Sequence, residues 1–587
     1  MNLVIDRYRY DIDLLKGCAI IAVVLYHAGW CKSGYLGVDV FFVVSGFLVI
    51  PSVMRQIREG NFRYLSFLEK RLFRLLPLVL LVSGLSLLVG YWGMLPGDYC
   101  FLSEEAVSAS VFMNNILQAV TTQNYWAAIY HKVLMHTWYL GVLFQFYLVF
   151  PLLLLLLKRR MKAWLLILTL LSLLLYLLPI DTIGNKYYLL PYRFFEMGIG
   201  GLVGVSWQRK LDSMGGLSLF CLLLMIFFGT FTIGERAMPY NLVGGTNTIR
   251  ESLLPRELLV LLTVLLTSLF LYVESEGSRL SSFARRSRVL APLGRMSLSI
   301  FLWHQPVFAF YRYFFEDQLS LSVLLSFMAI TLLLSCVTYR LIERRIRISM
   351  ISRVCLLVSF LAVNAFALWV YRQGGVVRDV PELDILKGSG GTAALERYTN
   401  RIYQYDKEFE LKDSVRTKVL IVGNSFARDF ANILLESSDS SRIQLSYHYG
   451  FDDCPQSRVR QCDRLYFFGW KYDVPSAVWQ SLCPESEIWG IGTKNFGTSN
   501  GIFYKNRYRE DYFAQRASIP QDFHTVNHLL REQWGDRYVD LLTPVLQPDS
   551  TVPIFTPDRH FIVYDGKHLT PAGARYYVSR LNAHILP

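Results

Sequence analysis

The sequence predicts a polytopic α-helical membrane domain followed by a water-soluble α/β domain. Of its 587 residues, 53% are hydrophobic and only 18% are charged, a balance that excludes a disordered chain. The hydrophobic residues gather in long runs up to about residue 371, whereas charged residues, Gly and Pro are spread throughout the remainder. Runs of about 20 apolar residues separated by short basic loops are typical of membrane-spanning helices.

We expect eleven membrane-spanning helices. Their approximate ranges are 14–30, 36–54, 75–95, 134–157, 163–180, 191–207, 214–233, 255–273, 294–315, 320–339 and 353–371. The first run is not expected to be a cleaved signal peptide, because acidic residues precede it and no small-residue cleavage site follows it.

The basic loops predict the orientation of these helices. Clusters of Lys and Arg follow the second, fourth, sixth, eighth and tenth runs, so these loops are expected in the cytoplasm. The amino terminus is then cytoplasmic, and an odd number of spans puts the tail from residue 372 outside the cytoplasm. The net charge of +13 fits these loops, so we expect a lipid bilayer and not nucleic acid as the partner. Nine Cys without a CxxC pair give no reason to expect a metal site.

Ionisable side chains inside an apolar run are costly and are therefore candidate functional groups. His27 ends the first run, eleven residues after Lys16, and Asp39 lies at the start of the second run. A neutral imidazole can act as the general base for a hydroxyl that attacks an acyl carbonyl. The alternative is a histidine that sits at the level of the lipid headgroups.

Three further features in the membrane part carry charge or a titratable ring. Arg71 and Arg74 share a helical face below the membrane, where they can bind the phosphates of an acyl-CoA or simply contact lipid headgroups. Arg193 and Glu196 are also three residues apart and can form a structural ion pair or line a tunnel. His304 lies close before a proline that can kink its helix, and both a chemical and a structural role are open.

The tail contains a candidate serine nucleophile. Residues 418–422 form a predicted buried strand, which ends in a turn carrying Ser425 and is followed by a helix-like stretch. A serine at such a turn lies near a helix amino terminus, whose dipole favours a developing anion. Far downstream, Asp565 and His568 are three residues apart, so the carboxylate can orient an imidazole that activates the serine. The alternative is an inactive or lectin-like domain in which the serine only caps the helix.

Several motifs in the first 345 residues resemble the acyltransferase-3 family of integral membrane acyltransferases. In chain order they are Tyr10–Lys16 followed by ten residues and His27, then Gly37–Phe47, Lys70–Pro77, His136–Leu140, Gln145–Tyr147, Arg193–Glu196, Leu293–Ser297 and Trp303–His304. The resemblance implies that His27 is the catalytic base and that Arg71 and Arg74 contact the acyl donor. We expect the other donor-side or substrate-side residues to be Lys16, Asp39, Arg193, Glu196 and His304. Family members usually carry Glu where this chain has Leu143.

The tail motifs resemble the SGNH family of hydrolases and esterases. Gly423-Asn-Ser425 stands where that family has Gly-Asp-Ser, and the Asp565-x-x-His568 block is intact. The resemblance implies a flavodoxin-like α/β fold with Ser425, His568 and Asp565 as catalytic residues. Gly450 and Asn495 are the candidate oxyanion residues.

Together the two resemblances match bacterial polysaccharide O-acetyltransferases of the OafA type. The expected domains are an acyltransferase-3 membrane domain (1–348), an eleventh membrane helix (349–375), a linker or domain edge (376–415) and an SGNH-like domain (416–587). Two tail cysteines, Cys454 and Cys462, are a hypothetical disulfide in an oxidising compartment.

The implied activity is transfer of an acetyl group from cytoplasmic acetyl-CoA to a hydroxyl of a surface polysaccharide. The expected acceptor is lipopolysaccharide O-antigen, the expected location is the bacterial inner membrane, and no bound cofactor is expected. Two alternatives stay open: an outer-face esterase that removes acetyl groups from glycans, and a transporter or flippase with a binding tail.

Overall fold

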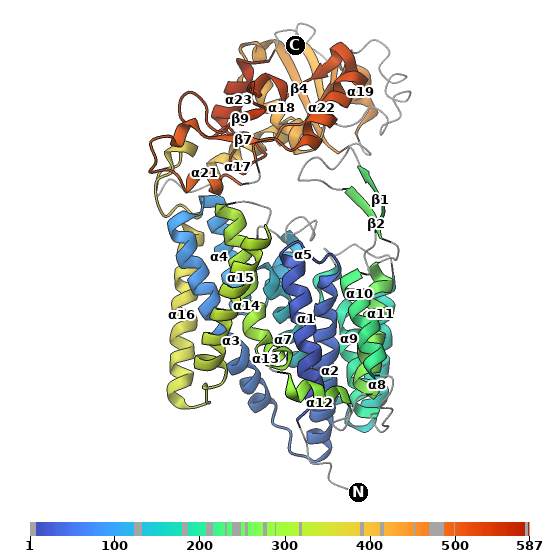
Figure 1. Cartoon of the computed structure of the whole chain (residues 1–587). Helices are drawn as coiled ribbons and strands as arrows, with labels where there is room; N and C mark the ends of the chain where they lie inside the picture. Colours follow the sequence, from blue (N-terminus) through green and yellow to red (C-terminus); the bar gives the residue numbers. More distant parts are fainter. Residues whose placement is uncertain are drawn as a thin grey trace. The chain divides into compact units, whose positions relative to one another are not determined.

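The computed structural model describes residues 8–585 except 122–131, 179–185, 207–214, 229–231, 238–247, 253–255, 274–278, 288, 316–319, 388–392, 411–415, 451–453, 469–486, 498 and 582–584. The chain divides into two compact units (Figure 1). The membrane unit comprises residues 1–92, 101–234 and 250–371, and the C-terminal unit comprises 93–100, 235–249 and 372–587.

The membrane unit is helical, as its apolar runs predict. Its helices are α1 (Tyr10–His27), α2 (Gly37–Arg58), α3 (Tyr64–Gly93), α4 (Pro96–Ser110), α5 (Asn114–Thr121), α7 (Trp138–Leu156), α8 (Met161–Leu177), α9 (Leu190–Ser206), α10 (Gly215–Phe228), α11 (Arg256–Val273), α12 (Arg279–Arg286), α13 (Leu290–Arg295), α14 (Ser297–Phe314), α15 (Leu321–Thr338) and α16 (Met350–Arg372). A separate two-stranded sheet pairs β1 (Thr232–Ala237) with β2 (Thr248–Ser252).

Each of the eleven predicted spans falls on a helix. Within the described residues, seven helices are long and apolar enough to cross a membrane: α2, α3, α7, α8, α11, α15 and α16. The other four predicted spans fall on α1, α9, α10 and α14, which carry charged residues or are shorter. The predicted helical membrane domain is therefore confirmed, whereas the number of eleven spans stays a prediction.

Glycines bring helices α2 and α9 into backbone contact. A Cβ atom at Gly46 of α2 would lie 1.9 Å from the carbonyl oxygen of Met197, and a Cβ at Gly200 of α9 would lie 2.1 Å from that of Val43. Small residues allow such close approach between helices in a bilayer. The approach brings Asp39 of α2 and Arg193 of α9 together in the interior.

The C-terminal unit contains a doubly wound parallel sheet. In its described part, five strands pair in the order β4-β3-β5-β6-β8. Their bounds are β3 (Thr417–Gly423), β4 (Ile443–Tyr449), β5 (Arg464–Phe468), β6 (Glu487–Ile491) and β8 (Tyr538–Val539). This is the flavodoxin-like order 2-1-3-4-5, in which ligands bind at the carboxyl end of the first strand, where the order reverses. The predicted α/β fold is thereby confirmed.

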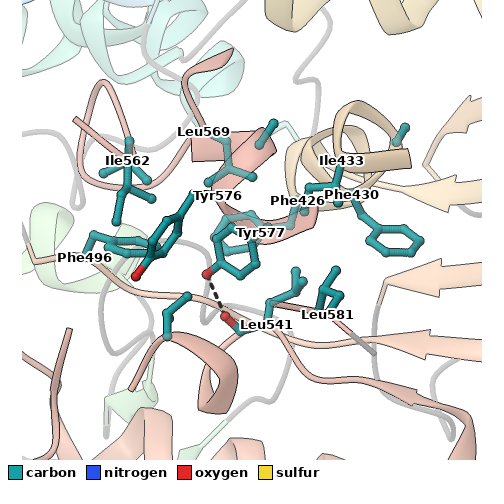
Figure 2. Packing of buried hydrophobic residues seen from close by; sticks show 14 of the residues in the cluster. Phe426, Phe430, Ile433, Phe496, Leu541, Ile562, Leu569, Tyr576, Tyr577 and Leu581 are labelled. Atoms are coloured by element: carbon teal, nitrogen blue, oxygen red, sulfur yellow. Dashed lines mark hydrogen bonds between the residues drawn. The ribbon is translucent and has the colours of Figure 1, made fainter. Parts of the chain in front are cut away.

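Helices and short segments surround this sheet (Figure 1). They are α17 (Ala393–Asn400), α18 (Ser425–Glu436), α19 (Gln456–Gln461), α21 (Gly501–Tyr504), α22 (Gln521–Trp534), α23 (Pro571–Val578) and an antiparallel pair of β7 (Arg516–Ser518) with β9 (Thr551–Pro553). Figure 2 shows Phe426 and Phe430 of α18 in the same core as Tyr577 of α23. The Tyr577 hydroxyl donates a hydrogen bond of 2.6 Å to the carbonyl of Leu541. This core fixes α18, whose first residue is Ser425.

The segment 376–415 belongs to the C-terminal unit. Val376, Val380, Ile385 and Ile402 are buried in its main core, so the described part of this segment packs against the unit. The predicted domain boundaries stay a prediction. The Gly-rich stretch 388–391 lies outside the described residues.

The hypothesis of a disulfide in the tail is wrong as stated. Cys454 and Cys462 are not bonded to each other, and the Cys462 thiol donates a hydrogen bond of 3.2 Å to the carbonyl oxygen of Val459 within a small apolar cluster. An apolar cluster suits a thiol, which behaves there as a small hydrophobic group. The third tail cysteine, Cys483, lies outside the described residues.

Candidate active sites

Ser425 is positioned by the turn between β3 and α18. Gly423 has a φ of 147°, which L side chains rarely adopt, and a Cβ there would lie 2.9 Å from that of Phe468. Asn424 caps α18, since its Oδ1 accepts a hydrogen bond of 2.9 Å from the amide of Phe426. Ser425 therefore begins a 12-residue helix at the carboxyl end of the first strand of the sheet.

The structure brings together the three tail residues that the sequence predicts. The Nε2 of His568 lies 2.9 Å from the Oγ of Ser425, and the Nδ1 of His568 lies 2.6 Å from Oδ2 of Asp565. The other oxygen of Asp565 accepts hydrogen bonds from the amides of Lys567 and His568, at 3.0 and 2.8 Å. This order of contacts is that of a Ser–His–Asp triad, recognised by its geometry.

The charge on Asp565 suits its place in the triad. Desolvation by the surrounding protein would raise the pKa of Asp565, but the His568 ring and the two backbone amides hold that pKa below its ordinary value. The carboxylate is therefore ionised at neutral pH and accepts the Nδ1 proton of His568. The Nε2 lone pair then faces the serine hydroxyl.

A buried ion pair beside the triad was missed by sequence reasoning. The Nζ of Lys494 lies 2.8 Å from Oδ2 of Asp429, and both side chains are almost fully buried. The same Asp429 oxygen accepts a hydrogen bond of 3.1 Å from the amide of Leu569, the residue after His568. Burial lowers the pKa of Lys494, and Asp429 opposes that shift. Asp429 thus connects helix α18 to the loop that carries His568. In the sequence, the only indication of this role was that Asp429 lies four residues after Ser425, one helical turn away.

The two oxyanion candidates are less well supported. The amide of Gly450 donates a hydrogen bond of 3.2 Å to the carbonyl of Gly423, which occupies that donor. The Oδ1 of Asn495 accepts a hydrogen bond of 2.9 Å from the amide of Gly497. The side-chain nitrogen of Asn495 is therefore the group that could donate a hydrogen bond to an oxyanion. Both roles stay predictions, and the bond made by Gly450 weighs against its part.

In the membrane unit, Lys16, Arg71 and Arg74 line one cavity of about 430 Å³. Arg295 and Arg344 line it too, against the acidic Asp13 and Glu343, so the described lining carries five basic and two acidic side chains. Sequence reasoning missed Arg295 and Arg344, although the first lies in the quoted Leu293–Ser297 motif and the second in the basic cluster after the tenth run.

Aromatic rings hold Arg71 at this cavity. Its guanidinium carbon lies 5.1 Å from the ring centroid of Phe67 and 5.3 Å from that of Tyr147, which also lines the cavity. Leu143, which stands where the family usually has Glu, is another lining residue and adds no charge. The cavity therefore suits an anionic ligand.

His27 and His304 lie in a buried cluster of histidines. Their ring centroids are 4.7 Å apart, and the ring of His136 lies 5.4 Å from that of His304. Phe301 lines the basic cavity and also contacts His136 and His304, with centroid distances of 5.2 and 5.7 Å. One aromatic ring thus adjoins both the cavity and the histidine cluster. His136, from the His136–Leu140 motif, becomes a further candidate site residue.

Asp39, Arg193 and Glu196 form a separate cluster. One guanidinium nitrogen of Arg193 lies 2.5 Å from Asp39 and another lies 3.0 Å from Glu196, and all three side chains are fully buried. None of the three is among the described residues that line the basic cavity. The cluster links α2 to α9, as an intramembrane ion pair can, and direct contact of these residues with a donor stays a prediction.

The family follows from the sequence of the membrane unit. Residues 9–340, more than half of the chain, match the family described as an acyltransferase domain, acyltransferase-3. The chain belongs to this family. It is thus a membrane-embedded, multi-pass acyltransferase. The matched residues include the histidine cluster and most of the lining of the basic cavity, Lys16, Arg71, Arg74 and Arg295 among them.

Two relatives are similar to this acyltransferase over different lengths. The "Putative O-acetyltransferase SAR0937" of Staphylococcus aureus strain MRSA252 is 25% identical over 495 residues, which cover 74% of this chain and 77% of the relative. The O-acetyltransferase OatA of S. aureus strain NCTC 8325 is 28% identical over 367 residues, 58% of this chain and 57% of OatA. The chain therefore spans just over half the length of OatA. No solved structure matches the chain.

Proposed function

We propose that this acyltransferase moves an acetyl group from cytoplasmic acetyl-CoA to a hydroxyl of a surface glycan, with lipopolysaccharide O-antigen as the expected acceptor. One observation carries the proposal. The same chain holds a basic cavity next to a buried histidine cluster in its membrane unit and a Ser–His–Asp triad in its C-terminal unit. Two relatives whose printed names are O-acetyltransferase support acetyl as the group transferred.

The basic cavity supports a CoA thioester as the donor. Guanidinium groups bind phosphate through two parallel hydrogen bonds, and CoA is rich in phosphate. The cavity volume of about 430 Å³ lies within the range of small-molecule sites. Arg71, Arg74 and Arg295 would hold the phosphates, which is consistent with the cytoplasmic location predicted for the loop after the second span.

The first transfer would use His27 as general base. His27 takes the proton from a hydroxyl that attacks the thioester carbonyl; a C–O bond forms, the C–S bond breaks, and CoA leaves as a thiolate that takes up a proton. His27 is buried, with 4% of its surface exposed, which limits competition by water for the acyl group.

The second transfer would use the triad. The Ser425 oxygen attacks the carbonyl of the acetyl ester formed in the first transfer while His568 takes the serine proton. The acetyl–serine C–O bond forms, the bond to the hydroxyl oxygen acylated in the first transfer breaks, and His568 gives its proton to that oxygen. The sugar hydroxyl then attacks the acetyl-serine ester, His568 takes the sugar proton, and Ser425 recovers a proton as the ester bond breaks. A variant of the proposal has direct transfer to the sugar without a Ser425 ester.

The proposed location is the bacterial inner membrane, with the amino terminus in the cytoplasm and the C-terminal unit in the periplasm. The test is the O-acetyl content of surface glycan in cells that produce the parent chain, His27→Ala or Ser425→Ala at equal levels. We expect mass spectrometry to detect acetyl esters only with the parent. Full acetylation with both variants would contradict the proposal.

The triad itself favours one second candidate, a glycan acetyl-esterase, because the same three side chains catalyse hydrolysis when water attacks the ester. Full-length chain in membranes, given an acetylated glycan and no acetyl-CoA, separates the two. Rapid release of acetate with no acetyl transfer from added acetyl-CoA would favour the esterase.

A further inference from the structure

We infer that Gln305 positions His27 and fixes its tautomer, so that Nε2 is the basic atom. This inference rests on the proposed role of His27 as general base. The Oε1 of Gln305 on α14 lies 2.5 Å from the Nδ1 of His27 at the end of α1. Both side chains are buried, so the contact is made within the protein interior.

The orientation of the Gln305 amide follows from its second contact. Its Nε2 donates a hydrogen bond of 2.8 Å to the backbone carbonyl of Lys132. A carbonyl oxygen only accepts hydrogen bonds, so a flipped amide would set two acceptors against each other. The amide oxygen therefore faces His27 and can only accept. His27 must carry its proton on Nδ1, which leaves the lone pair of the neutral ring on Nε2.

Helix α14 holds His27 at a second point. The Nη2 of Arg312, seven residues or about two turns after Gln305, donates a hydrogen bond of 2.7 Å to the backbone carbonyl of His27. A cation suits this place, because the last carbonyls of α1 carry partial negative charge. The ring and the main chain of His27 are thus both fixed by one neighbouring helix, a rigid support for a base that must meet its substrate in one geometry.

Gln305 parallels Asp565 in the other site. In both cases the Nδ1 of a histidine faces an oxygen acceptor, at 2.5 Å in the membrane unit and 2.6 Å in the C-terminal unit. A neutral amide fixes the tautomer without placing an unpaired carboxylate in the bilayer interior, where such a charge is costly. The titratable or charged groups that face His27 are His304 and Arg312 from α14 and His136 from the segment before α7.

The test compares variants of Gln305 in membrane vesicles that transfer acetyl from acetyl-CoA. Gln305→Leu and the unbranched Gln305→Met lack a strong acceptor, so we expect kcat to fall about 10- to 100-fold, part of the roughly 10²–10⁴-fold that general bases contribute. The KM for acetyl-CoA should not change, because Gln305 is not among the described residues lining the basic cavity. Ser335→Ala removes a buried hydroxyl from the adjacent α15 without touching His27 and serves as the control.

The Gln305→Glu variant distinguishes a positioning role from a merely structural one, through its kcat and its pH–rate profile. The carboxylate still accepts the Nδ1 proton, so this variant should exceed the leucine variant in kcat. It also favours the imidazolium, so the acidic limb of its pH–rate profile should move to higher pH. Parental kcat in both Gln305→Leu and Gln305→Met, with His27→Ala inactive, would overturn the positioning role alone. An active His27→Ala variant would instead contradict the proposed function.

Discussion

The Nε2 of His568 lies 2.9 Å from the Oγ of Ser425, although the two residues are 143 positions apart in the sequence. The contact exists because Ser425 begins the helix after the first strand of the sheet and His568 lies just before α23, which packs on that helix. The two halves of the candidate site are therefore held by one core.

Asp565→Asn tests whether the carboxylate orients His568. The amide retains the shape of the side chain but loses the charge that favours the Nδ1 proton, so acetyl transfer through Ser425 should fall about 10²- to 10⁴-fold. The measurement is the rate at which a fluorophosphonate probe labels Ser425 in the full-length chain. Asp549→Asn, which changes an exposed aspartate in the same unit, is the matched control. Equal labelling of Asp565→Asn and the parent would rule out the orienting role.

Asp429 and Lys494 should stabilise the C-terminal unit only when both are present. Either Asp429→Asn or Lys494→Met leaves a buried charge without its partner and should lower the free energy of unfolding of the C-terminal unit by about 3–5 kcal/mol. The double variant should lose less than either single variant, because no charge is then left buried. Thermal unfolding of the three variants measures this difference. Additive losses in the double variant would show that the two residues act independently.

Arg71→Ala and Arg295→Ala should weaken binding of the donor phosphates. Each removes one cation from the lining of the basic cavity, so the KM for acetyl-CoA should rise about tenfold, the loss of one charge-assisted hydrogen bond. Donor titrations in membrane vesicles measure this effect. Arg159→Ala, an exposed arginine that does not line the described cavity, controls for the loss of a positive charge.

A short acetyl thioester without phosphate sharpens the same test. Transfer from this analogue should be equally fast in the parent and in Arg71→Ala, since it offers the guanidinium nothing to bind. If Arg71→Ala slows both donors alike, the arginine does not recognise phosphate and the assignment of the cavity fails.

Asp540 should stabilise the C-terminal unit at neutral pH and lose this contribution in acid. Burial would raise its pKa, but hydrogen bonds from Thr543, Arg531 and the amide of Leu542 hold that pKa below the ordinary value. A depressed pKa in the folded state adds stability above the ordinary pKa of about 4, and this stability is lost as the pH falls further. Asp540→Asn should therefore lower Tm at pH 7 and have a smaller effect at pH 3. An equal decrease in Tm at both values would contradict this linkage.

The sequence was sufficient for features that depend on composition and short spacings. Long apolar runs predicted the helical membrane unit, and the strand before Ser425 with the Asp565-x-x-His568 spacing predicted the members of the triad. Lys16, Arg71 and Arg74 were predicted as donor-side residues from the motifs that contain them, and only the fold shows that they line one cavity.

Other features depend on contacts that no local pattern encodes. Lys494 meets Asp429 only because the loop after β6 lies beside α18 in the folded sheet. Val376 and Val380 have no helical or strand periodicity around them, so the segment was predicted as a linker or domain edge and its burial in the core was not foreseen. Gln305 is adjacent to His304 in the sequence, but its contact with His27 could not be predicted because it depends on how α14 packs on α1.

Transfer across the membrane can be measured with isotopically labelled acetyl-CoA, supplied only to the cytoplasmic side of sealed membranes that carry the glycan acceptor on the other side. We expect labelled acetyl esters on the glycan with the parent chain and none above background with His27→Ala or Ser425→Ala. Label on the glycan at the parental level in both variants would contradict the proposed function.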